Sequence, residues 1–322
     1  MTTVIPVASG KGGVGKTIIS ANLGVLLAKA GKAVILVDLD LGASNLHTCL
    51  GVKNTNMGIG NYVYKQAESL ESLLVPTDFG RLYLIPGDSL LPGTANLPFF
   101  RKRRIVKELS ELVADFVILD LGAGSNYNTV DFFLTSLTGL VVVTPETTSI
   151  LNAYSFIKTA LFRMLHRSFP AKSAERRLIQ DFSAGRLEGS DTSIGNLVER
   201  LNALSRRSGG HAGEKLDAFM PRVIVNMGRD QGDLELGARL RRVVRRNLGT
   251  DIEYIGFVAH DDNVGISVAR RRPYADMAPD SPFARTLGAT AKRLIDTPVP
   301  RTPQLFEDDE DLVEIAEEMV TH

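Results

Sequence analysis

The 322-residue chain contains one cysteine, Cys49, and lacks long apolar runs. A lone thiol cannot supply an intramolecular disulfide, a zinc cluster or an iron–sulfur site, which excludes these groups within one chain. Every apolar run is shorter than the about 18 residues expected of a membrane-spanning helix. The first residues show no basic segment followed by an apolar stretch, so we expect no signal peptide. These absences favour a cytoplasmic protein.

The charge of the chain is balanced overall but unevenly distributed. Lys plus Arg and Asp plus Glu both number 37, yet from Arg301 onward eight acidic residues accompany one base. This tail therefore carries −7 and the remainder +7. We expect an acidic amphipathic helix in the tail, which anionic lipid would repel, so that any membrane contact is peripheral at most. The tail is also a candidate to fold onto basic surface of the same chain. The apolar residues of the tail recur at the spacing of an amphipathic helix: Leu312, Ile315, Ala316, Met319 and Val320.

Short apolar runs rich in β-branched residues alternate with helical patterns along most of the chain. Several runs are apolar throughout, as expected of strands covered on both faces. The alternation predicts an α/β fold with a doubly wound, mostly parallel sheet flanked by helices. The predicted strands are Thr3–Ala8, Ala33–Asp38, Leu82–Ile85, Phe116–Asp120, Leu140–Thr144, Arg222–Asn226 and Tyr254–Val258. The predicted helices are 17–30, 98–113, 128–138, 149–167, 230–248, 262–270 and 283–296.

Residues 168–219 interrupt this alternation because they are polar and basic, with helical patterns near 173–182 and 193–206. We interpret them as an insertion on the rim of the sheet, with a mobile loop as the alternative. The predicted organisation is a single domain over residues 1–297 that carries this insertion. A proline-rich linker and the acidic helix follow at 298–322.

The stretch from Gly10 to Thr17 matches G-x-x-x-x-G-K-[ST], the phosphate-binding loop, and lies between a predicted strand and a predicted helix. Its glycines let the backbone approach phosphate oxygens closely, and its N–H groups would point at the anion. Lys16 is expected to reach the β- and γ-phosphates, and the Thr17 hydroxyl to contact Mg²⁺. The predicted phosphate-contacting residues are Gly10, Lys11, Gly12, Gly13, Val14, Gly15, Lys16, Thr17 and Ile18.

Carboxylates end two other predicted strands. Asp38 and Asp40 follow the second strand, and their i, i+2 spacing predicts that both point to the same side. Asp120 ends a run of four apolar residues, which is the Walker B pattern for holding Mg²⁺. Gly122 and Gly124 follow it and would allow that loop to move. We therefore predict that Thr17, Asp38 and Asp120 serve the metal, and that Asp40 reaches the attacking water.

Asn226 ends another predicted strand, where its amide can both donate to and accept from a purine edge. Proteins that bind GTP typically show Asn-Lys-x-Asp at this place. Here the aspartate, Asp230, is displaced by one position. We therefore predict adenine as the base and ATP as the nucleotide.

A lysine directly after the first glycine, Lys11, marks the deviant Walker A motif, and with it the chain resembles the MinD/ParA family. The stretch Asp38–Gly42 with Asn45 is similar to the switch I of that family, and Asp120–Gly124 to its Walker B motif and switch II. The resemblance implies an Mg²⁺-dependent ATPase that forms a homodimer around two ATP molecules, with Lys11 reaching across to the partner. It implies catalytic roles for Lys11, Lys16 and Asp40, with Asn45 near the interface. Turnover is expected to be slow without a stimulating partner.

The cellular role is open between two branches of the family. The run Asp38–Leu46 resembles FlhG-like proteins, which favours a switch of FlhG or MinD type that positions or counts a cellular structure through an unidentified activator or cargo. The alternative is a ParA-like protein that binds DNA non-specifically in chromosome or plasmid partition. This alternative is based on a set of arginines on one predicted helix, which could contact DNA phosphates: Arg239, Arg241, Arg242, Arg245 and Arg246.

Overall fold

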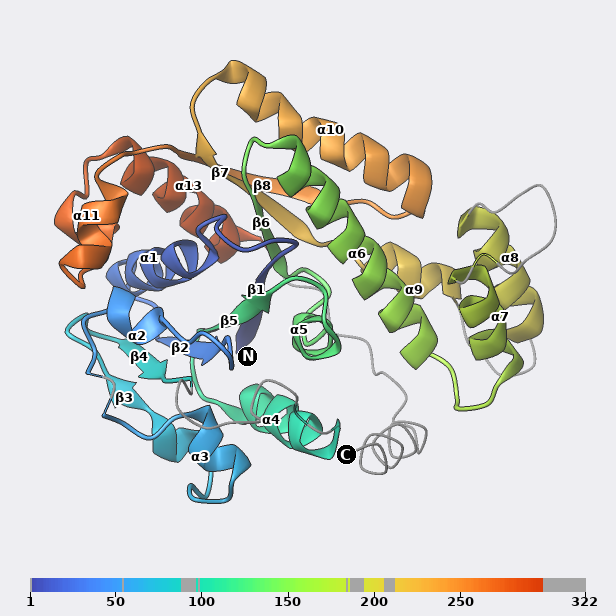
Figure 1. Cartoon of the computed structure of the whole chain (residues 1–322), viewed down its shortest axis with the longest axis horizontal. Coiled ribbons are helices and arrows are strands. Elements are labelled where there is room, and N and C mark those ends of the chain that lie inside the picture. Colours follow the sequence, from blue (N-terminus) through green and yellow to red (C-terminus); the bar gives the residue numbers. More distant parts are fainter. Residues whose placement is uncertain are drawn as a thin grey trace.

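The computed structural model describes residues 2–53, 55–87, 97, 99–183, 185, 194–205 and 212–297. Its centre is an eight-stranded sheet of order β3-β4-β2-β5-β1-β6-β7-β8, parallel throughout except for the β3–β4 pair (Figure 1). This confirms the predicted α/β fold with a mostly parallel sheet. The strands are β1 (Thr3–Ser9), β2 (Val34–Leu39), β3 (Val75–Pro76), β4 (Leu82–Ile85), β5 (Phe116–Ala123), β6 (Leu140–Val143), β7 (Arg222–Gly228) and β8 (Glu253–Ala259).

Helices cover both faces of the sheet, so the central strands are buried on both sides. On β5, Val117 and Leu119 point into one apolar core while Ile118 points into the other, and all three are fully buried. The first core lies under α4 (Phe99–Glu111), α5 (Tyr127–Phe133), α6 (Thr147–Arg167) and α10 (Gln231–Leu248). The second lies under α1 (Lys16–Lys29), α2 (Leu46–Cys49), α12 (Tyr274–Met277) and α13 (Pro282–Asp296). None of the described helices is both long and apolar enough to span a membrane.

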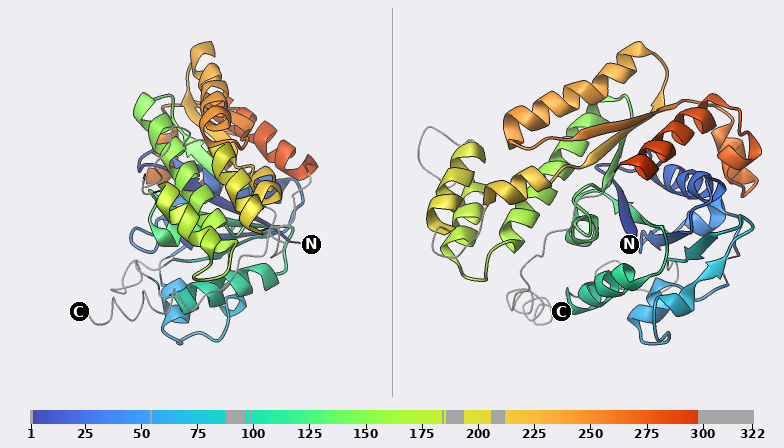
Figure 2. Two further views of the ribbon diagram at one scale, coloured as in Figure 1. Left: turned by 90° about the vertical axis from the view of Figure 1, so that its right-hand side faces the viewer. Right: turned by 180° about the vertical axis from the view of Figure 1, so that it is seen from behind.

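The predicted insertion contributes three helices that stack beside α6. They are α7 (Ala174–Ser183), α8 (Ile194–Ser205) and α9 (Ala212–Ala218). Leu178, Leu197 and Leu216 bring them into the same apolar core as α6. Figures 1 and 2 show α7 and α8 at one end of the molecule, beside the C-terminal half of α6. Residues 184, 186–193 and 206–211 of this segment lie outside the described residues, as do the linker and tail at 298–322. The division into domains stays a prediction.

The elements that the sequence did not reveal are short. They are β3, α2, α3 (Ile59–Val63), the 3₁₀ turn Glu71–Leu73, α9 and α12. A segment of two to seven residues shows too little periodicity to be recognised, and Pro76 further weakens the strand pattern of β3. Two predicted helices are shorter than expected: α5 ends at Phe133, and α11 (Val264–Ala269) spans six residues.

The aromatic packing under α6 is expected to contribute strongly to the stability of the fold. Phe156 of α6 is fully buried and meets the edge of the Phe133 ring, with centroids 4.9 Å apart. Replacing Phe156 with Ala should lower the free energy of unfolding by about 3–5 kcal/mol, because a cavity replaces the ring. Urea denaturation measures this loss. Phe100→Ala is the matched control, since Phe100 is exposed, and a similar loss in both variants would contradict the assigned packing.

Candidate nucleotide-binding site

The loop between β1 and α1 is a backbone cradle that opens outward. Gly13 and Gly15 have φ angles of 81° and 83°, in the left-handed region that side chains rarely adopt. Gly15 begins α1 without a side-chain cap, so the N–H groups of the first turn, which includes Thr17 and Ile18, are directed toward an incoming anion. A Cβ added to Gly12 or Gly13 would meet no atom within 4 Å. This rim therefore has room for phosphate oxygens.

Two close contacts fix the loop against the rest of the molecule. A Cβ on Gly10 would lie 2.2 Å from the carbonyl oxygen of Asn152 on α6, so only glycine fits there. At the other end, the Asn226 Nδ2 atom at the end of β7 donates to the Val14 carbonyl oxygen at 2.8 Å. Asn226 thus supports the phosphate loop, a role that its sequence position did not indicate. Its predicted contact with a purine stays a prediction.

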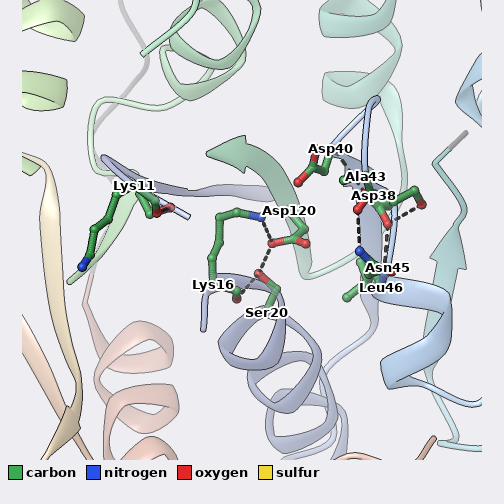
Figure 3. A network of polar contacts seen from close by, with 11 residues as sticks. Lys11, Lys16, Ser20, Asp38, Asp40, Ala43, Asn45, Leu46 and Asp120 are labelled. Atoms are coloured by element: carbon green, nitrogen blue, oxygen red, sulfur yellow. Dashed lines mark hydrogen bonds and ion pairs between the residues drawn. The ribbon is translucent and has the colours of Figure 1, made fainter. Parts of the chain in front are cut away.

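Lys16 and Asp120 form a buried ion pair under the loop (Figure 3). The Lys16 ammonium donates to Asp120 Oδ1 at 2.9 Å, and the Ser20 hydroxyl donates to the same oxygen at 2.9 Å. The exposed fractions of the Lys16 and Asp120 side chains are 7% and 1%. The structure therefore places together the two residues for which the sequence predicts phosphate and metal contacts. Ser20 was not predicted, although it lies one helical turn after Lys16.

Asp38 lies beside Asp120 on the neighbouring strand and is fully buried. Its Oδ1 accepts from the Asp40 N–H at 3.1 Å, and its Oδ2 accepts from the Ser44 hydroxyl at 2.7 Å and the Leu46 N–H at 3.0 Å. Burial, with a smaller contribution from the Asp120 charge, raises the pKa of Asp38 to about 7. These contacts make Asp38 the residue that shapes the loop after β2. The metal role of Asp38 stays a prediction.

Asp40 does not share the direction of Asp38, contrary to the expectation from their spacing. The strand ends at Leu39, so alternation no longer applies at position 40. In Figure 3 the Asp40 carboxylate is directed toward Asp120, whereas Asp38 faces the residues 44–46. Burial raises the pKa of Asp40, the Lys16 charge opposes this, and the Asp120 charge adds to it.

The predicted switch residues border Asp40. A Cβ on Gly122, near the end of β5, would lie 3.5 Å from Asp40 Oδ1, so the end of β5 lies next to the loop after β2. Gly124 has a φ of 84°, and its N–H donates to the Ser9 carbonyl oxygen at 3.0 Å. Asn45 is exposed, and its Nδ2 atom donates to the Ala43 carbonyl oxygen at 2.7 Å. A change in one of these loops is therefore expected to affect the other.

Lys11 points away from the cradle. Its ammonium forms an ion pair with Glu146 and lies 3.4 Å from the Thr148 hydroxyl, at the start of α6. Figure 3 shows the ammonium groups of Lys11 and Lys16 directed to different sides of the loop. Glu146 was not predicted. Its position shortly after β6, at the same edge of the sheet as Asp120, is the signal that could have identified it.

With this geometry in place, comparison with known proteins defines the class. Residues 5–274 match the family model described as the CobQ/CobB/MinD/ParA nucleotide binding domain. The chain belongs to this family, which confirms the resemblance inferred from Lys11 and the switch motifs, and it is a P-loop ATPase of the MinD/ParA type.

Two proteins of similar sequence and one solved structure of similar fold illustrate the place of the chain within the family. The chain is 26% identical over 304 residues to the antiactivator FleN of Pseudomonas aeruginosa, covering 94% of this chain and 89% of FleN. It is 38% identical over 163 residues to the flagellum site-determining protein YlxH of Helicobacter pylori, which is 49% of this chain and 53% of YlxH. The structure of MinD from Pyrococcus horikoshii has a similar fold, with a TM-score of 0.61 and 21% identity, covering 91% of this chain and 96% of that one.

The raised pKa of Asp38 generates a pH prediction. The ordinary pKa of 3.8 applies to the unfolded chain, so between about pH 4 and pH 7 the folded protein retains a proton that the unfolded chain has released. This contribution to stability is lost as the pH rises through that range. The stability of Asp38→Asn relative to the unmodified protein should therefore increase from pH 4.5 to pH 8 in urea titrations. Asp78→Asn, an exposed control, should show no such trend, and a constant difference for Asp38→Asn would contradict the assignment.

Proposed function

We propose that this protein is a switch that binds and hydrolyses ATP with Mg²⁺ and dimerises when ATP is bound. The observation that carries the proposal is the divergence of Lys11 and Lys16. Lys16 lies inside the cradle, where it would bind the phosphates of its own subunit. Lys11 lies on the outer side with Glu146 and Thr148, where it would serve a second subunit. Two cations on opposite sides of one loop suit two nucleotides enclosed between two loops.

The donors around the cradle suit a nucleotide held with a divalent cation. The Thr17 hydroxyl and the Asp120 carboxylate are hard oxygen ligands of the kind that Mg²⁺ prefers. When bound, Mg²⁺ would neutralise charge on the phosphate oxygens. The similar fold of MinD from Pyrococcus horikoshii, which was solved with Mg-ADP, supports this proposal.

Hydrolysis would then depend on two displacements of side chains and on one carboxylate that orients water. Lys16 exchanges Asp120 for phosphate oxygens, and Lys11 exchanges Glu146 for phosphates of the partner subunit. Asp40, at the contact between the two switch loops, orients the attacking water. The motifs that form the cradle contain no arginine, so we propose that turnover is slow until a partner protein binds.

For the cellular role, we propose that the switch positions or counts a cellular structure together with a protein partner. The relatives named as an antiactivator and as a flagellum site-determining protein favour flagella as the first structure to examine. Co-purification with the dimeric, ATP-bound protein would identify the partner.

Asp40→Ala should separate ATP binding from hydrolysis. Loss of the carboxylate that orients water should reduce turnover about 10²-fold or more, leaving an ATP-bound dimer. Multi-angle light scattering with ATP and Mg²⁺ measures the dimer, and phosphate release measures turnover. Lys11→Ala is the matched control, because it keeps the Lys16 cradle but should stay monomeric while still binding ATP. An Asp40→Ala protein that stays monomeric at saturating ATP would refute the dimer switch.

A second candidate function is nucleotide-dependent binding of DNA, favoured by the outer face of α10. Arg242, Arg245 and Arg246 are exposed there, and Arg242 and Arg246 form no ion pair with the residues that the structure describes. Arg241 is less available, because its Nε and Nη2 atoms donate to the two carboxylate oxygens of Asp251 at 2.6 Å each. Exposed guanidinium groups along one helix suit a row of phosphates.

This candidate is tested by changing Arg242, Arg245 and Arg246 together to Glu. If α10 contacts phosphates, affinity for a duplex of arbitrary sequence should fall about tenfold or more with ATP present, and the salt dependence should become shallower. Fluorescence anisotropy measures both. Arg241→Ala is the control and should change little. Equal DNA affinity in the triple variant and the unmodified protein would remove DNA binding through α10 from consideration.

A further inference from the structure

We propose that the acidic tail, residues 303–322, docks on the outer face of α10 and screens its arginines. The docking face is formed by Arg239, Arg242, Val243 and Arg246. The proposal concerns contacts within one chain and does not depend on nucleotide binding.

The docking face is basic with an apolar centre. The helix turns Leu240, Val244 and Leu248 toward the core, so the residues between them face outward. Val243 has 43% of its surface exposed, in the middle of the arginines. Arg239 meets Glu235 only at 3.5 Å in an exposed pair, which contributes little. The face therefore offers both positive charge and an apolar contact to a ligand.

The tail has the complementary chemistry. Residues 303–322 contain eight acidic residues and no Lys or Arg, so the tail carries −8 and the rest of the chain +8. Its apolar residues at helical spacing would place one apolar stripe between acidic flanks. A segment of this composition can pack its apolar residues on Val243 while its carboxylates pair with the arginines. A segment with acidic residues alone would contact only the arginines.

The chain leaves the described fold at the same end of β8 as this face, but on the other side of the sheet. The β8 strand is the last strand of the sheet, with α10 packed on one face and α13 on the other. Arg293, near the end of α13, donates to the Ile255 carbonyl oxygen at 2.7 Å, near the start of β8. The end of α10 leads into the start of β8 through Gly249. Thr297 and Arg246 therefore lie at the same end of β8, on opposite faces of it.

The length of the linker is sufficient for the tail to pass around the edge strand. Residues 298–306, which precede the first acidic residue of the tail, span up to about 30 Å when extended. Two helix layers of about 10 Å diameter with a sheet between them require roughly 20–30 Å. Each exposed ion pair contributes only about 0–1 kcal/mol. Tethering raises the effective concentration of the tail to the millimolar range, so docking occurs at low salt and yields to a competing polyanion or to high salt.

Distance measurement by pulsed electron paramagnetic resonance on the full-length protein tests the docking. Nitroxide labels at Asn247→Cys on α10 and Thr321→Cys in the tail form the reporter pair. Cys49 needs no replacement, because it is buried and burial raises the pKa of its thiol to about 12. We expect a short, narrow distance distribution at 50 mM salt that becomes long and broad at 500 mM. Changing Arg242 and Arg246 to Glu should abolish the short distance at 50 mM.

Two controls keep the result specific to α10. Labels at Ser110→Cys and Thr321→Cys place one reporter on α4, another helix with exposed basic residues, and should give a long, broad distribution. Reversing two charges on α4, Arg101→Glu with Lys107→Glu, should leave the short α10 distance intact. The proposal is overturned by a broad α10–tail distribution at low salt, by a short distance that survives Arg242→Glu with Arg246→Glu, or by a short distance to α4 instead.

Discussion

The candidate site depends on placing two carboxylates side by side on adjacent parallel strands, at the sheet edge next to the proposed phosphate cradle. Asp38 and Asp120 are paired in register, and both are buried. Burying two negative charges on directly paired residues of neighbouring strands would cost too much free energy. The fold therefore needs a cation beside one carboxylate and a proton on the other. Lys16 supplies the cation to Asp120, while Asp38 retains its proton up to about pH 7. Drawing Lys16 toward a phosphate would leave Asp120 without a cation. Phosphate and a divalent cation are therefore expected to bind together.

The two lysines of the loop differ in how firmly they are held. Lys16 and Asp120 are almost completely buried, and breaking such a pair without a replacement costs about 3–5 kcal/mol. Lys11 and Glu146 have exposed fractions of 29% and 58%, and a surface pair of this kind contributes about 0–1 kcal/mol. In the proposed switch, the step that engages a second subunit therefore has a low cost. The step that engages the nucleotide requires a ligand able to replace a buried ion pair.

Much of this site could be predicted from the sequence, because its residues follow strands whose apolar runs are plain. For that reason Lys16 and Asp120 were expected at the same edge of the sheet, where the structure pairs them, and the strand of Asp120 was found from its four apolar residues. The hydrogen-bond partners within the site could not be predicted, because they depend on the paths of loops and on the order of the strands. The partners of Asp38 are Ser44 and Leu46, six and eight residues away, and nothing in their spacing reveals that the loop returns to the strand end. Asn226 and Val14 are separated by 212 residues, a contact that only the sheet order creates.

The same architecture limits where the switch can move. α5 begins at Tyr127, directly after the loop that follows β5, and its Asp131 accepts from Lys102 at 2.5 Å, Arg163 at 2.9 Å and Arg167 at 3.1 Å. These buried contacts join α5 to both α4 and α6. Rearrangement of the segment from Gly122 to Gly124 is therefore confined to the residues before α5. α6 begins beside the Glu146 that holds Lys11 and ends beside α7, so one continuous helix connects the outer lysine of the phosphate loop with the helices of the predicted insertion. A partner bound at α7 would thus act on Lys11 through a rigid element, provided that binding there shifts α6.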